Sequence, residues 1–553
     1  MELQRREADV LVIGGGIAGC MAAIRARELG LSVILWDKAN PRRSGGAATG
    51  IDHCWAYLPE IHEKQLTKDE MVEDHLHNAA GGFAKAELVR AIVDDSRARV
   101  ADLERFGVPM RDDAGNFRLI KKLHRVPSFI HFAGRDIKVI LTHEMVRKRV
   151  KIFKRVMAIE LLKEGNRVVG CVGISTKEPL VYACKAKAVI LTTGGTYRLY
   201  SNPTQLPFNV SHPPSDTGDG QAMAFRAGAR LVNMEFVNFH IGPKNFARAG
   251  RGSYVPGGRI VNSFGLPLGQ KPGEQAIDRT VENPAAFRRE YNEGRGPCYM
   301  DLRGATSENI EYIKWALTNE GNTAYLGYLE DQGIDFATQP VEWDVYEPKQ
   351  SSGLSGLDIG TQAQTSLVGL FAAGDVVGAL SRSVCPGALT FGYRAADSAA
   401  KFISSSPLLD PGEESESKIS SVLSSAKYFL TRKYGASWEE ALSATQNLMS
   451  NYCGLIRSAS LLEAGIDHLN HLEEQIREEG QVANPHELYR LFEVLNLLEV
   501  GRLIAYAALY RTESRYTPWS PRVDFPQADD ENWHKLITLW KEKEKIEFSK
   551  LSL

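Results

Sequence analysis

Three glycines and one acidic residue near the start of the chain have types and a spacing that suit the binding of a dinucleotide. Gly14, Gly16 and Gly19 follow a short apolar run, and Asp37 lies about 20 residues further along. The first glycine permits a tight turn, the second lets the backbone approach a pyrophosphate, and the third lets a helix pack closely on a strand. Asp37 would accept hydrogen bonds from a ribose. The pattern predicts a nucleotide-binding turn, with a glycine-rich turn that holds no ligand as the alternative.

The segments around this motif are those that a βαβ unit requires. Residues 8–13 (ADVLVI) and 32–38 (SVILWDK) have the pattern of buried strands, and residues 20–30 between them have that of a helix. Two later apolar runs, 187–195 and 369–375, also end in small residues. Parallel strands deliver such loops to one edge of a sheet. We therefore expect a Rossmann-like α/β domain whose last strand comes late in the chain.

Other loops indicate a more extended ligand. Loop 42–50 (RRSGGAATG) directly follows the second strand, and turn 217–220 (TGDG) precedes a helix and a later acid. NAD and FAD both use the opening turn, but several separated loops that converge on one elongated ligand favour FAD. We expect the following residues to bind this cofactor: Gly14, Gly16, Gly19, Asp37, Lys38, Ser44, Gly45, Gly46, Thr193, Gly194, Asp219, Glu235, Asp375, Gly387, Ala388 and Leu389.

A single arginine, Arg382, lies in a loop of small residues that leads into an apolar helix expected to begin at Pro386 and Gly387. Helix N-termini have unpaired N–H groups and a partial positive charge, and arginine binds anions through its forked guanidinium. The two features together predict a site for a negative or electron-rich group. A plain surface ion pair is the alternative for Arg382.

The composition excludes several classes of function. The chain of 553 residues is 43% hydrophobic and 24% charged with a formal net charge of −2, so it has no overall attraction for nucleic acid or a membrane surface. No apolar run approaches the roughly 20 residues of a transmembrane segment. The seven cysteines show no CxxC spacing, which argues against a disulfide framework, a zinc site or an iron–sulfur cluster within the chain. We expect a reduced, cytoplasmic protein.

The patterning divides the chain into three expected parts. Residues 1–239 and 335–402 form the FAD-binding domain, and the glycine- and proline-rich insertion 240–334 forms an α+β capping domain. Residues 403–553 form a C-terminal helical domain with an extended tail. Its apolar residues recur at the three- and four-residue spacing of helices.

Whole motifs then indicate a family. With GGGIAG, RRSGGAATG, TTGG, TGDG, EFVNFH, FAAGD and RTESR, the chain resembles the flavoprotein subunits of the succinate dehydrogenase/fumarate reductase family over nearly its whole length. Within that family it looks most similar to the α subunit of adenylylsulfate reductase, in loops 42–50 and 375–392 and in the ending 511–536. The resemblance implies FAD on the sheet domain, a cap that closes a substrate site over the flavin, and a helix at Pro386 that faces the pyrimidine end of the flavin.

The resemblance also implies catalytic residues. Arg279 aligns with the family's catalytic arginine, which moves a proton while flavin N5 moves a hydride, and His240 aligns with a substrate-side histidine. Arg382 takes the place of an active-site histidine. An arginine exchanges a proton only where its pocket perturbs it, because free guanidinium is effectively always protonated. An exposed arginine and a hydrogen-bonded core histidine are the alternatives for Arg279 and His240.

Some positions depart from the family's pattern and concern the substrate. Trp55 replaces a polar residue of the substrate site, and Ser351 stands where succinate and fumarate enzymes have a histidine. With Arg251, beside GSYVPGG, these residues are expected to contact a small, anionic substrate. Loop 42–50 has no histidine, to which FAD is covalently linked in those enzymes, so the resemblance implies non-covalent FAD.

A basic stretch suggests a partner. Residues 118–155 contain twelve Lys and Arg but two acids, which indicates either a solvated helical face or a docking surface for an acidic electron-transfer partner. The aromatic residues are not interleaved as nucleic-acid binding requires. Because the chain has no cluster ligands, we expect a separate, ferredoxin-like iron–sulfur subunit.

The predicted function is that of an FAD-dependent oxidoreductase that passes a hydride between flavin N5 and a small, anionic substrate. An electron-relay subunit without its own substrate and a stand-alone flavin oxidase are the alternatives.

Overall fold

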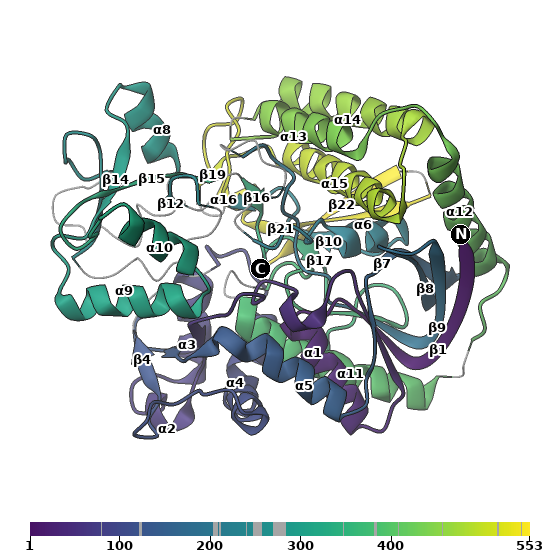
Figure 1. Cartoon of the computed structure of the whole chain (residues 1–553), viewed down its shortest axis with the longest axis horizontal. Helices are drawn as coiled ribbons and strands as arrows, with labels where there is room; N and C mark the ends of the chain where they lie inside the picture. The colour runs from purple at the N-terminus through teal and green to yellow at the C-terminus, as the bar shows by residue number, and fades with distance from the viewer. Residues whose placement is uncertain are drawn as a thin grey trace.

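The protein was analysed as a computed structural model of the whole chain (Figure 1). It describes residues 1–78, 80–120, 124–202, 208, 212–238, 241–246, 257–268, 284–346, 348–380, 384–406, 409–455, 457–516, 519–543 and 545–553. Of residues 284, 285, 288 and 384 only the backbone is described.

A seven-stranded sheet with the order β6-β2-β1-β9-β8-β7, and with β18 beside β9, forms the centre of the cofactor lobe. Its strands are β1 (Glu2–Ile13), β2 (Val33–Asp37), β6 (Lys151–Lys154), β7 (Val156–Glu164), β8 (Arg167–Ser175), β9 (Leu180–Leu191) and β18 (Leu370–Ala372). Strands β6, β2, β1, β9 and β18 are parallel, whereas β7 and β8 are antiparallel additions. The expected Rossmann-like sheet, with a last strand from far along the chain, is confirmed.

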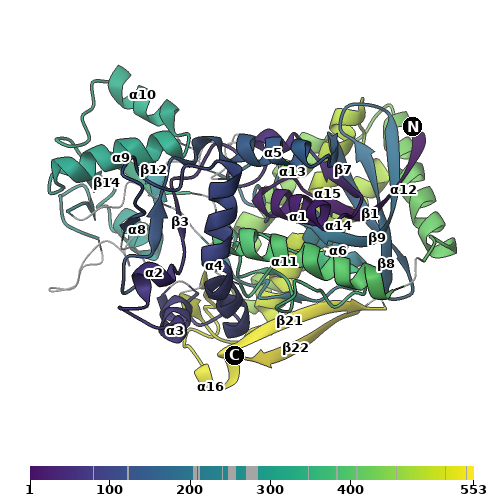
Figure 2. The same cartoon turned by 90° about the horizontal axis from the view of Figure 1, so that it is seen from below.

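Helices α1 (Ile17–Glu28) and α11 (Val384–Ser405) lie side by side next to this sheet (Figure 2). Gly392 permits the close approach, because a Cβ there would lie 2.5 Å from the Ala18 carbonyl oxygen. Helix α11 begins two residues before the expected start at Pro386. The other helices of the cofactor lobe are α2 (Pro59–His62), α3 (Lys68–Asn78), α4 (Ala86–Phe106), α5 (Ile137–Arg147) and α6 (Asp219–Arg226).

Residues between Ile241 and Trp343 build a second hydrophobic cluster, which lies to one side of the first in Figure 1. Its sheet has the order β12-β15-β14-β13. The elements are β12 (Ile241–Pro243), β13 (Arg259–Val261), α8 (Pro284–Asn292), β14 (Cys298–Asp301), α9 (Ser307–Asn319), α10 (Thr323–Asp331) and β15 (Val341–Val345). We call this unit the cap.

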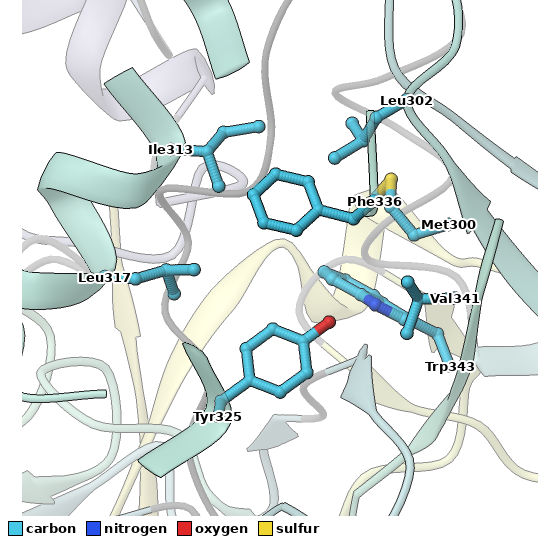
Figure 3. Close-up of a pocket in the computed structure, with 8 residues that line it drawn as sticks. All are labelled: Met300, Leu302, Ile313, Leu317, Tyr325, Phe336, Val341 and Trp343. Atoms are coloured by element: carbon cyan, nitrogen blue, oxygen red, sulfur yellow. The ribbon is translucent and has the colours of Figure 1, made fainter. Parts of the chain in front are cut away.

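A small apolar pocket lies inside the cap (Figure 3). Aliphatic, thioether and aromatic side chains from its sheet and from α9 and α10 form the wall: Met300, Leu302, Ile313, Leu317, Tyr325, Phe336, Val341 and Trp343. These residues belong to the hydrophobic cluster of the cap. The pocket is therefore part of the packing that holds the cap together.

The C-terminal part contains four long helices, of which three pack around α15, and α15 is buried along most of its length. They are α12 (Glu413–Thr431), α13 (Trp438–Tyr452), α14 (Ala459–Glu479) and α15 (Pro485–Tyr510). Ser437 and Glu440 form a capping box at the start of α13, and Asn484 caps α15 with proline at the first helical position. These capping residues fix the first residues of helices α13 and α15.

Short strands join distant parts of the chain in further sheets, ordered β3-β5-β4, β16-β11-β20-β19 and β17-β10-β21-β22. The last of these contains the C-terminal hairpin, which was expected only as an extended tail. The remaining short elements are η1 (Pro41–Arg43), β3 (His53–Trp55), β4 (Arg118–Ile120), β5 (Phe129–His131), η2 (Gly134–Asp136), β10 (Leu231–Val232), β11 (Val237–Asn238), β16 (Lys349–Gln350), β17 (Gly356–Leu357), β19 (Arg515–Tyr516), β20 (Trp519–Ser520), α16 (Asp530–Trp533), β21 (Lys535–Glu542) and β22 (Lys545–Ser552).

The basic stretch 118–155 is not one helical face. Its described residues form β4, β5, η2, α5 and β6. Most of its cationic side chains are exposed, but Lys138 is completely buried. The exposed cations lie on several elements, and Lys138 has a different role.

Candidate functional site

The glycine turn between β1 and α1 is built as the sequence requires. Gly14 has φ +103°, and a Cβ there would lie 2.3 Å from the Thr192 carbonyl oxygen. A Cβ on Gly19 would lie 1.9 Å from the Gly14 carbonyl oxygen. Both positions therefore exclude any side chain, because the backbone of α1 approaches strands β1 and β9 directly.

Beside this tight contact, the turn leaves open space. A Cβ on Gly16 would meet only the Gly45 Cα, at 4.0 Å, and a Cβ on Gly46 would meet nothing within 4 Å. Gly16 is the N-cap of α1 and has no side chain that caps the helix. The first N–H groups of α1 therefore face a cradle between two glycine loops, which fits the phosphates of a dinucleotide.

Asp37 fixes the shape of the cradle. Its buried carboxylate accepts hydrogen bonds from the Gly15 and Ala39 N–H groups and from the Ser44 hydroxyl, each at 2.8 Å. Oδ2 thus holds the glycine turn and loop 42–50 together, while Oδ1 binds the Ala39 N–H. The expected contact of Asp37 with a ribose remains a prediction.

Lys138 was missed by the sequence analysis as a part of this site. It reaches from α5 under the glycine turn, where its ammonium group donates to the Gly15 carbonyl oxygen and lies 3.0 Å from the Cys20 Sγ. Its only sequence signal was a lysine in a basic stretch, and this position is 123 residues from Gly15. Lys138 supports the turn and is unavailable to a docking partner.

Lys38 lies at the centre of a buried ionic network. Its ammonium group is 2.7 Å from both Asp219 Oδ2 and Glu493 Oε1, and it donates to the Thr217 hydroxyl at 2.9 Å. Burial alone would raise the pKa of Glu493, but Lys38 and Arg198 hold it down to about 2. The network fixes α6 and the TGDG turn to helix α15.

Two further acids face this region. Burial raises the pKa of Asp375, at the end of β18, to about 6, although Lys349 opposes the shift. Burial, and then the charge of Asp375, raises the pKa of Asp216 well above its usual range. Among the described residues, no hydrogen bond reaches the Asp375 carboxylate. An acid that accepts no hydrogen bond from the described residues at this strand end fits a hydroxyl-rich ligand such as the ribityl chain of FAD.

Asp216 directly precedes the TGDG turn and was not predicted as a site residue. Its carboxylate lies against Gly194, where a Cβ would be only 2.8 Å from Asp216 Oδ2 and where φ is +81°. The neighbouring Thr193 has a buried hydroxyl with no hydrogen-bond partner among the described residues. Thr193, Gly194, Asp216 and Asp375 thus meet at one edge of the sheet, as the parallel topology predicts.

The start of α11 contacts the same lobe. A Cβ on Gly387 would lie 2.6 Å from Leu380 Cδ2, and Ala388 and Leu389 are buried. Arg382, His240, Arg251 and Arg279 lie outside the described residues. Their expected roles therefore remain predictions.

Trp55 and Ser351, expected at the substrate, are both buried. The Trp55 ring stacks on His75 with 4.3 Å between centroids and meets His124 edge-on. The Ser351 hydroxyl and the Trp55 indole N–H have no hydrogen-bond partner among the described residues. Each retains a polar atom that a ligand could satisfy.

The cap closes directly on loop 42–50. Gly50, at φ +127°, faces the cap, because a Cβ there would lie 2.1 Å from the Asn319 carbonyl oxygen. Gly321 of the cap faces Thr49 in the same way, at 2.6 Å. The Thr49 hydroxyl donates to the Glu320 carbonyl oxygen at 2.8 Å. Glycines on both sides thus let two backbones meet beside the cradle.

Polar groups extend this contact. The Tyr312 hydroxyl of the cap donates to Asp52 Oδ2 at 3.3 Å and also contacts His131, and Asp52 is hydrogen-bonded to His53. Asp52, His53 and Glu320 place one ligand atom each within 4.8 Å of one another, and these atom types suit a divalent cation. Within the described residues they mark the junction of the cap with the cofactor lobe.

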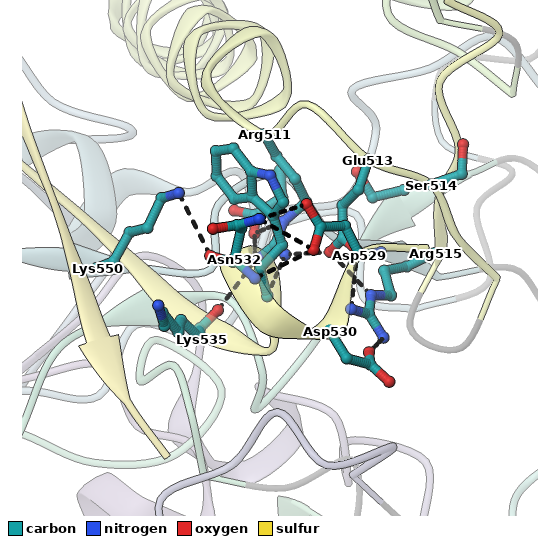
Figure 4. Close-up of polar contacts among 12 residues, drawn as sticks. Arg511, Glu513, Ser514, Arg515, Asp529, Asp530, Asn532, Lys535 and Lys550 are labelled. Atoms are coloured by element: carbon teal, nitrogen blue, oxygen red, sulfur yellow. Dashed lines mark hydrogen bonds and ion pairs between the residues drawn. The ribbon is translucent and has the colours of Figure 1, made fainter. Parts of the chain in front are cut away.

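Glu235, another expected cofactor residue, lies in a different setting. It is buried, and Arg511 donates to its Oε1 at 2.9 Å. Arg511 also binds Glu513 and the Trp533 and Lys535 carbonyl oxygens, in the polar network of Figure 4. The RTESR motif therefore ties the end of the chain to the residue that was expected to contact the cofactor.

The fold and the two-loop cradle define an FAD-binding flavoprotein, and comparison with known proteins supports this class. Residues 9–388 match the family described as FAD binding domain, and residues 443–553 match the one described as fumarate reductase flavoprotein C-term. The chain belongs to the succinate dehydrogenase/fumarate reductase flavoprotein family, is an FAD-dependent oxidoreductase and has FAD as its cofactor.

Individual relatives are distant but full-length. The chain is 28% identical to one chain of the fumarate reductase (CoM/CoB) of Methanothermobacter marburgensis, over 98% of both chains. It is 29% identical to the fumarate reductase flavoprotein subunit of Mycobacterium tuberculosis, over 96% of this chain and 94% of the other. The fold matches adenylylsulfate reductase of Archaeoglobus fulgidus with a TM-score of 0.85 and 24% identity, over 100% of this chain and 96% of the other.

Proposed function

We propose that the chain is a flavoprotein subunit that exchanges two electrons between FAD and a small, anionic substrate bound beneath the cap. The observation that carries this proposal is the contact of the cap with loop 42–50 through Gly50 and Gly321, immediately beside the glycine cradle. FAD, when bound, supplies hydride transfer at N5. A cap in this position excludes water from the reacting atoms.

The chain's own residues would hold the substrate and move its proton. On the family resemblance we assign catalytic roles to Arg279, His240 and Arg382, with proton transfer at Arg279. We assign substrate binding to Arg251, because of its charge and its place beside GSYVPGG, and to Trp55. The Ser351 hydroxyl, which has no hydrogen-bond partner within the described part of the chain, is assigned to the same pocket. Fumarate, in the names of two relatives, and adenylylsulfate, in the name of a structural neighbour, are both small anions. Arginines are suited to such substrates.

We further propose that electrons reach the flavin through a separate, ferredoxin-like iron–sulfur subunit. The exposed cations of residues 118–155, including Arg147, Lys151 and Lys154, give an acidic partner a surface on α5 and β6. Within the described part of the chain, no helix combines the length and the apolar character of a membrane span. We propose a cytoplasmic location. The three domain ranges given above also remain proposals, although β15, beyond residue 334, pairs with strands of the cap.

The test is reoxidation of the flavin in the FAD-loaded protein. The flavin is reduced without oxygen, and fumarate or adenylylsulfate is then added while the flavin absorption is recorded. We expect one small anion to reoxidise the flavin, and Arg279→Gln to slow this step by at least about tenfold. Arg289→Gln is the control, because Arg289 is an exposed arginine on helix α8 of the same cap.

An electron-relay subunit is the second candidate, favoured by the buried Trp55 and Ser351 at positions that hold polar groups elsewhere in the family. It predicts that no small anion perturbs the flavin spectrum and that Arg279→Gln leaves electron flow through the complex unchanged. Rapid reoxidation by oxygen alone would instead identify a stand-alone oxidase.

We also propose that FAD is bound non-covalently, since loop 42–50 has no histidine. Acid precipitation of the holoprotein should leave the yellow flavin in the supernatant. Flavin that remains with the precipitate would contradict this.

A further inference from the structure

Two cysteines from distant parts of the sequence lie on neighbouring elements of the cofactor lobe. Cys54 lies in the middle of strand β3, and Cys385 lies in the first turn of helix α11. Because side chains alternate along a strand, the Cys54 side chain points away from the face that bears His53 and Trp55. Strand β3 packs directly against helix α11, which places Cys54 and Cys385 on two elements in contact. Cys385 is also the neighbour that, followed by burial, raises the pKa of Cys54.

The two thiols differ in their access to solvent. All seven cysteines lie in the described part of the chain, and six of them are buried. Cys385 is the exception, with partial exposure at the start of α11. Cys385 is therefore the thiol that a dissolved reagent reaches first, and Cys54 is the buried thiol directly behind it.

A second pair of cysteines provides an internal comparison. Cys171 and Cys184 stand directly opposite each other in the antiparallel strands β8 and β9. Both have no exposed surface. This pair shares the proximity of Cys54 and Cys385 but lacks an entry point for a reagent, so proximity and access can be separated within one molecule.

We propose that Cys54 and Cys385 form a reversible disulfide by exchange with a low-molecular-weight disulfide. The Cys385 thiolate attacks one sulfur of the small disulfide, whose S–S bond breaks and whose other half leaves as a thiol after taking up a proton. The Cys54 thiolate then attacks the Cys385 sulfur in the mixed disulfide and displaces the second half. The two protein thiols are oxidised, the small disulfide is reduced to two thiols, and the protons released by the cysteines end on these thiols.

The position of the pair gives this bond a structural consequence. Strand β3 follows loop 42–50, which forms one wall of the cradle, and α11 contains Gly387, Ala388 and Leu389, which are expected to contact FAD. A covalent link between β3 and the first turn of α11 therefore joins two segments that each adjoin residues expected to contact FAD. This inference concerns the thiols alone and does not depend on the proposed substrate.

The test uses the FAD-loaded protein, reduced and freed of reductant, with oxidised glutathione as the small disulfide. Free thiols are trapped with an alkylating reagent in acid-quenched samples, and the peptides are mapped by mass spectrometry. We expect a peptide pair linked through Cys54 and Cys385, which dithiothreitol reverts to two free thiols. Cys171 and Cys184 should remain free thiols throughout.

A matched variant separates the two chemical steps. In Cys54→Ser the second displacement is impossible, so Cys385 should accumulate a stable glutathione adduct that the unmodified protein does not retain. A lasting adduct on Cys385 of the unmodified protein, or full alkylation of both thiols after glutathione treatment, would overturn the proposal. If Cys54→Ser does not fold, the peptide map of the unmodified protein decides the question alone.

Discussion

At the scale of single residues, Asp37 illustrates how a motif residue does more than its motif describes. The fingerprint interprets this acid as a ribose ligand, but its two oxygens already accept three hydrogen bonds from Gly15, Ala39 and Ser44. Because the acceptor is charged and buried, these bonds are worth more than neutral ones. Asp37 therefore sets the distance between the two glycine loops, whatever it contacts in the holoprotein.

Replacing this carboxylate should weaken FAD binding. We expect Asp37→Ala to lower the affinity of the apoprotein for FAD by at least about tenfold, the equivalent of about 1.4 kcal/mol. Ser44→Ala removes one of the three bonds and should have a clearly smaller effect. Fluorescence titration with FAD measures both constants. Equal effects of the two substitutions would show that Asp37 has no organising role.

Asp375 leads to a prediction on pH. Its pKa is about 6 in the folded chain and 3.8 in the reference state, so between these values the folded protein binds the additional proton. The contribution of Asp375 to stability is therefore greatest below about pH 4 and is lost as the pH rises toward 6. Asp375→Asn removes this loss of stability, because the amide does not ionise.

We accordingly expect Asp375→Asn apoprotein to unfold at a higher temperature than the unmodified apoprotein at pH 7, with a smaller difference at pH 4. The same substitution should weaken FAD binding, because an amide is a poorer acceptor for ribityl hydroxyls than a carboxylate. Thermal unfolding across this pH range, with and without FAD, measures both effects. A variant that loses stability at pH 7 without FAD would contradict the assignment.

At the scale of elements, the junction between cap and cofactor lobe depends on backbone contact rather than on side chains. Gly50 cannot accept a side chain for two reasons, its φ of +127° and the Asn319 carbonyl oxygen 2.1 Å from a Cβ. Gly50→Ala should therefore cost at least about 2 kcal/mol and displace the cap. Faster proteolysis within the cap and a raised KM for the substrate are the expected readouts.

Gly107→Ala is the control for this prediction. Gly107 also has a positive φ, +97°, but a Cβ there would meet nothing within 4 Å. Gly107→Ala should lower the free energy of unfolding only by the cost of the left-handed backbone, about 1–2 kcal/mol, and should leave KM unchanged. If the two variants behave alike, the close approach of the cap has no energetic importance.

The elements also show what the sequence could and could not predict. The βαβ opening, the late strand β18 and the C-terminal helices follow from local patterns, because apolar periodicity and glycine spacing lie within short windows. The roles of Lys138 and of the hairpin β21–β22 do not follow from local patterns, because each depends on a partner that is distant in the sequence. Leu539, for example, pairs with Leu231 across more than half of the chain.

At the scale of the whole molecule, the family motifs predicted the class of cofactor but not the use of each residue. EFVNFH and RTESR were both recognised as motifs, yet their connection appears only in three dimensions, where Glu235 binds Arg511. A resemblance transfers positions, whereas burial and partners depend on how distant segments pack. Asp216 is likewise beyond local patterns, because it enters the site only by packing against Gly194.

The connection between Glu235 and Arg511 gives the last prediction. Arg511 is fully buried and neutralises both Glu235 and Glu513 while it binds two backbone carbonyls of the C-terminal segment. Arg511→Gln would leave two buried carboxylates without this cation, at a cost of about 3–5 kcal/mol. Adding Glu235→Gln should restore part of that loss, because one uncompensated charge disappears.

Arg515→Gln, which removes a less buried partner of Glu513, should cost less than Arg511→Gln. Denaturant unfolding of these three variants and of Glu235→Gln alone measures these differences. Additive losses in the double variant would show that the chain's end is not held to the cofactor lobe by charge.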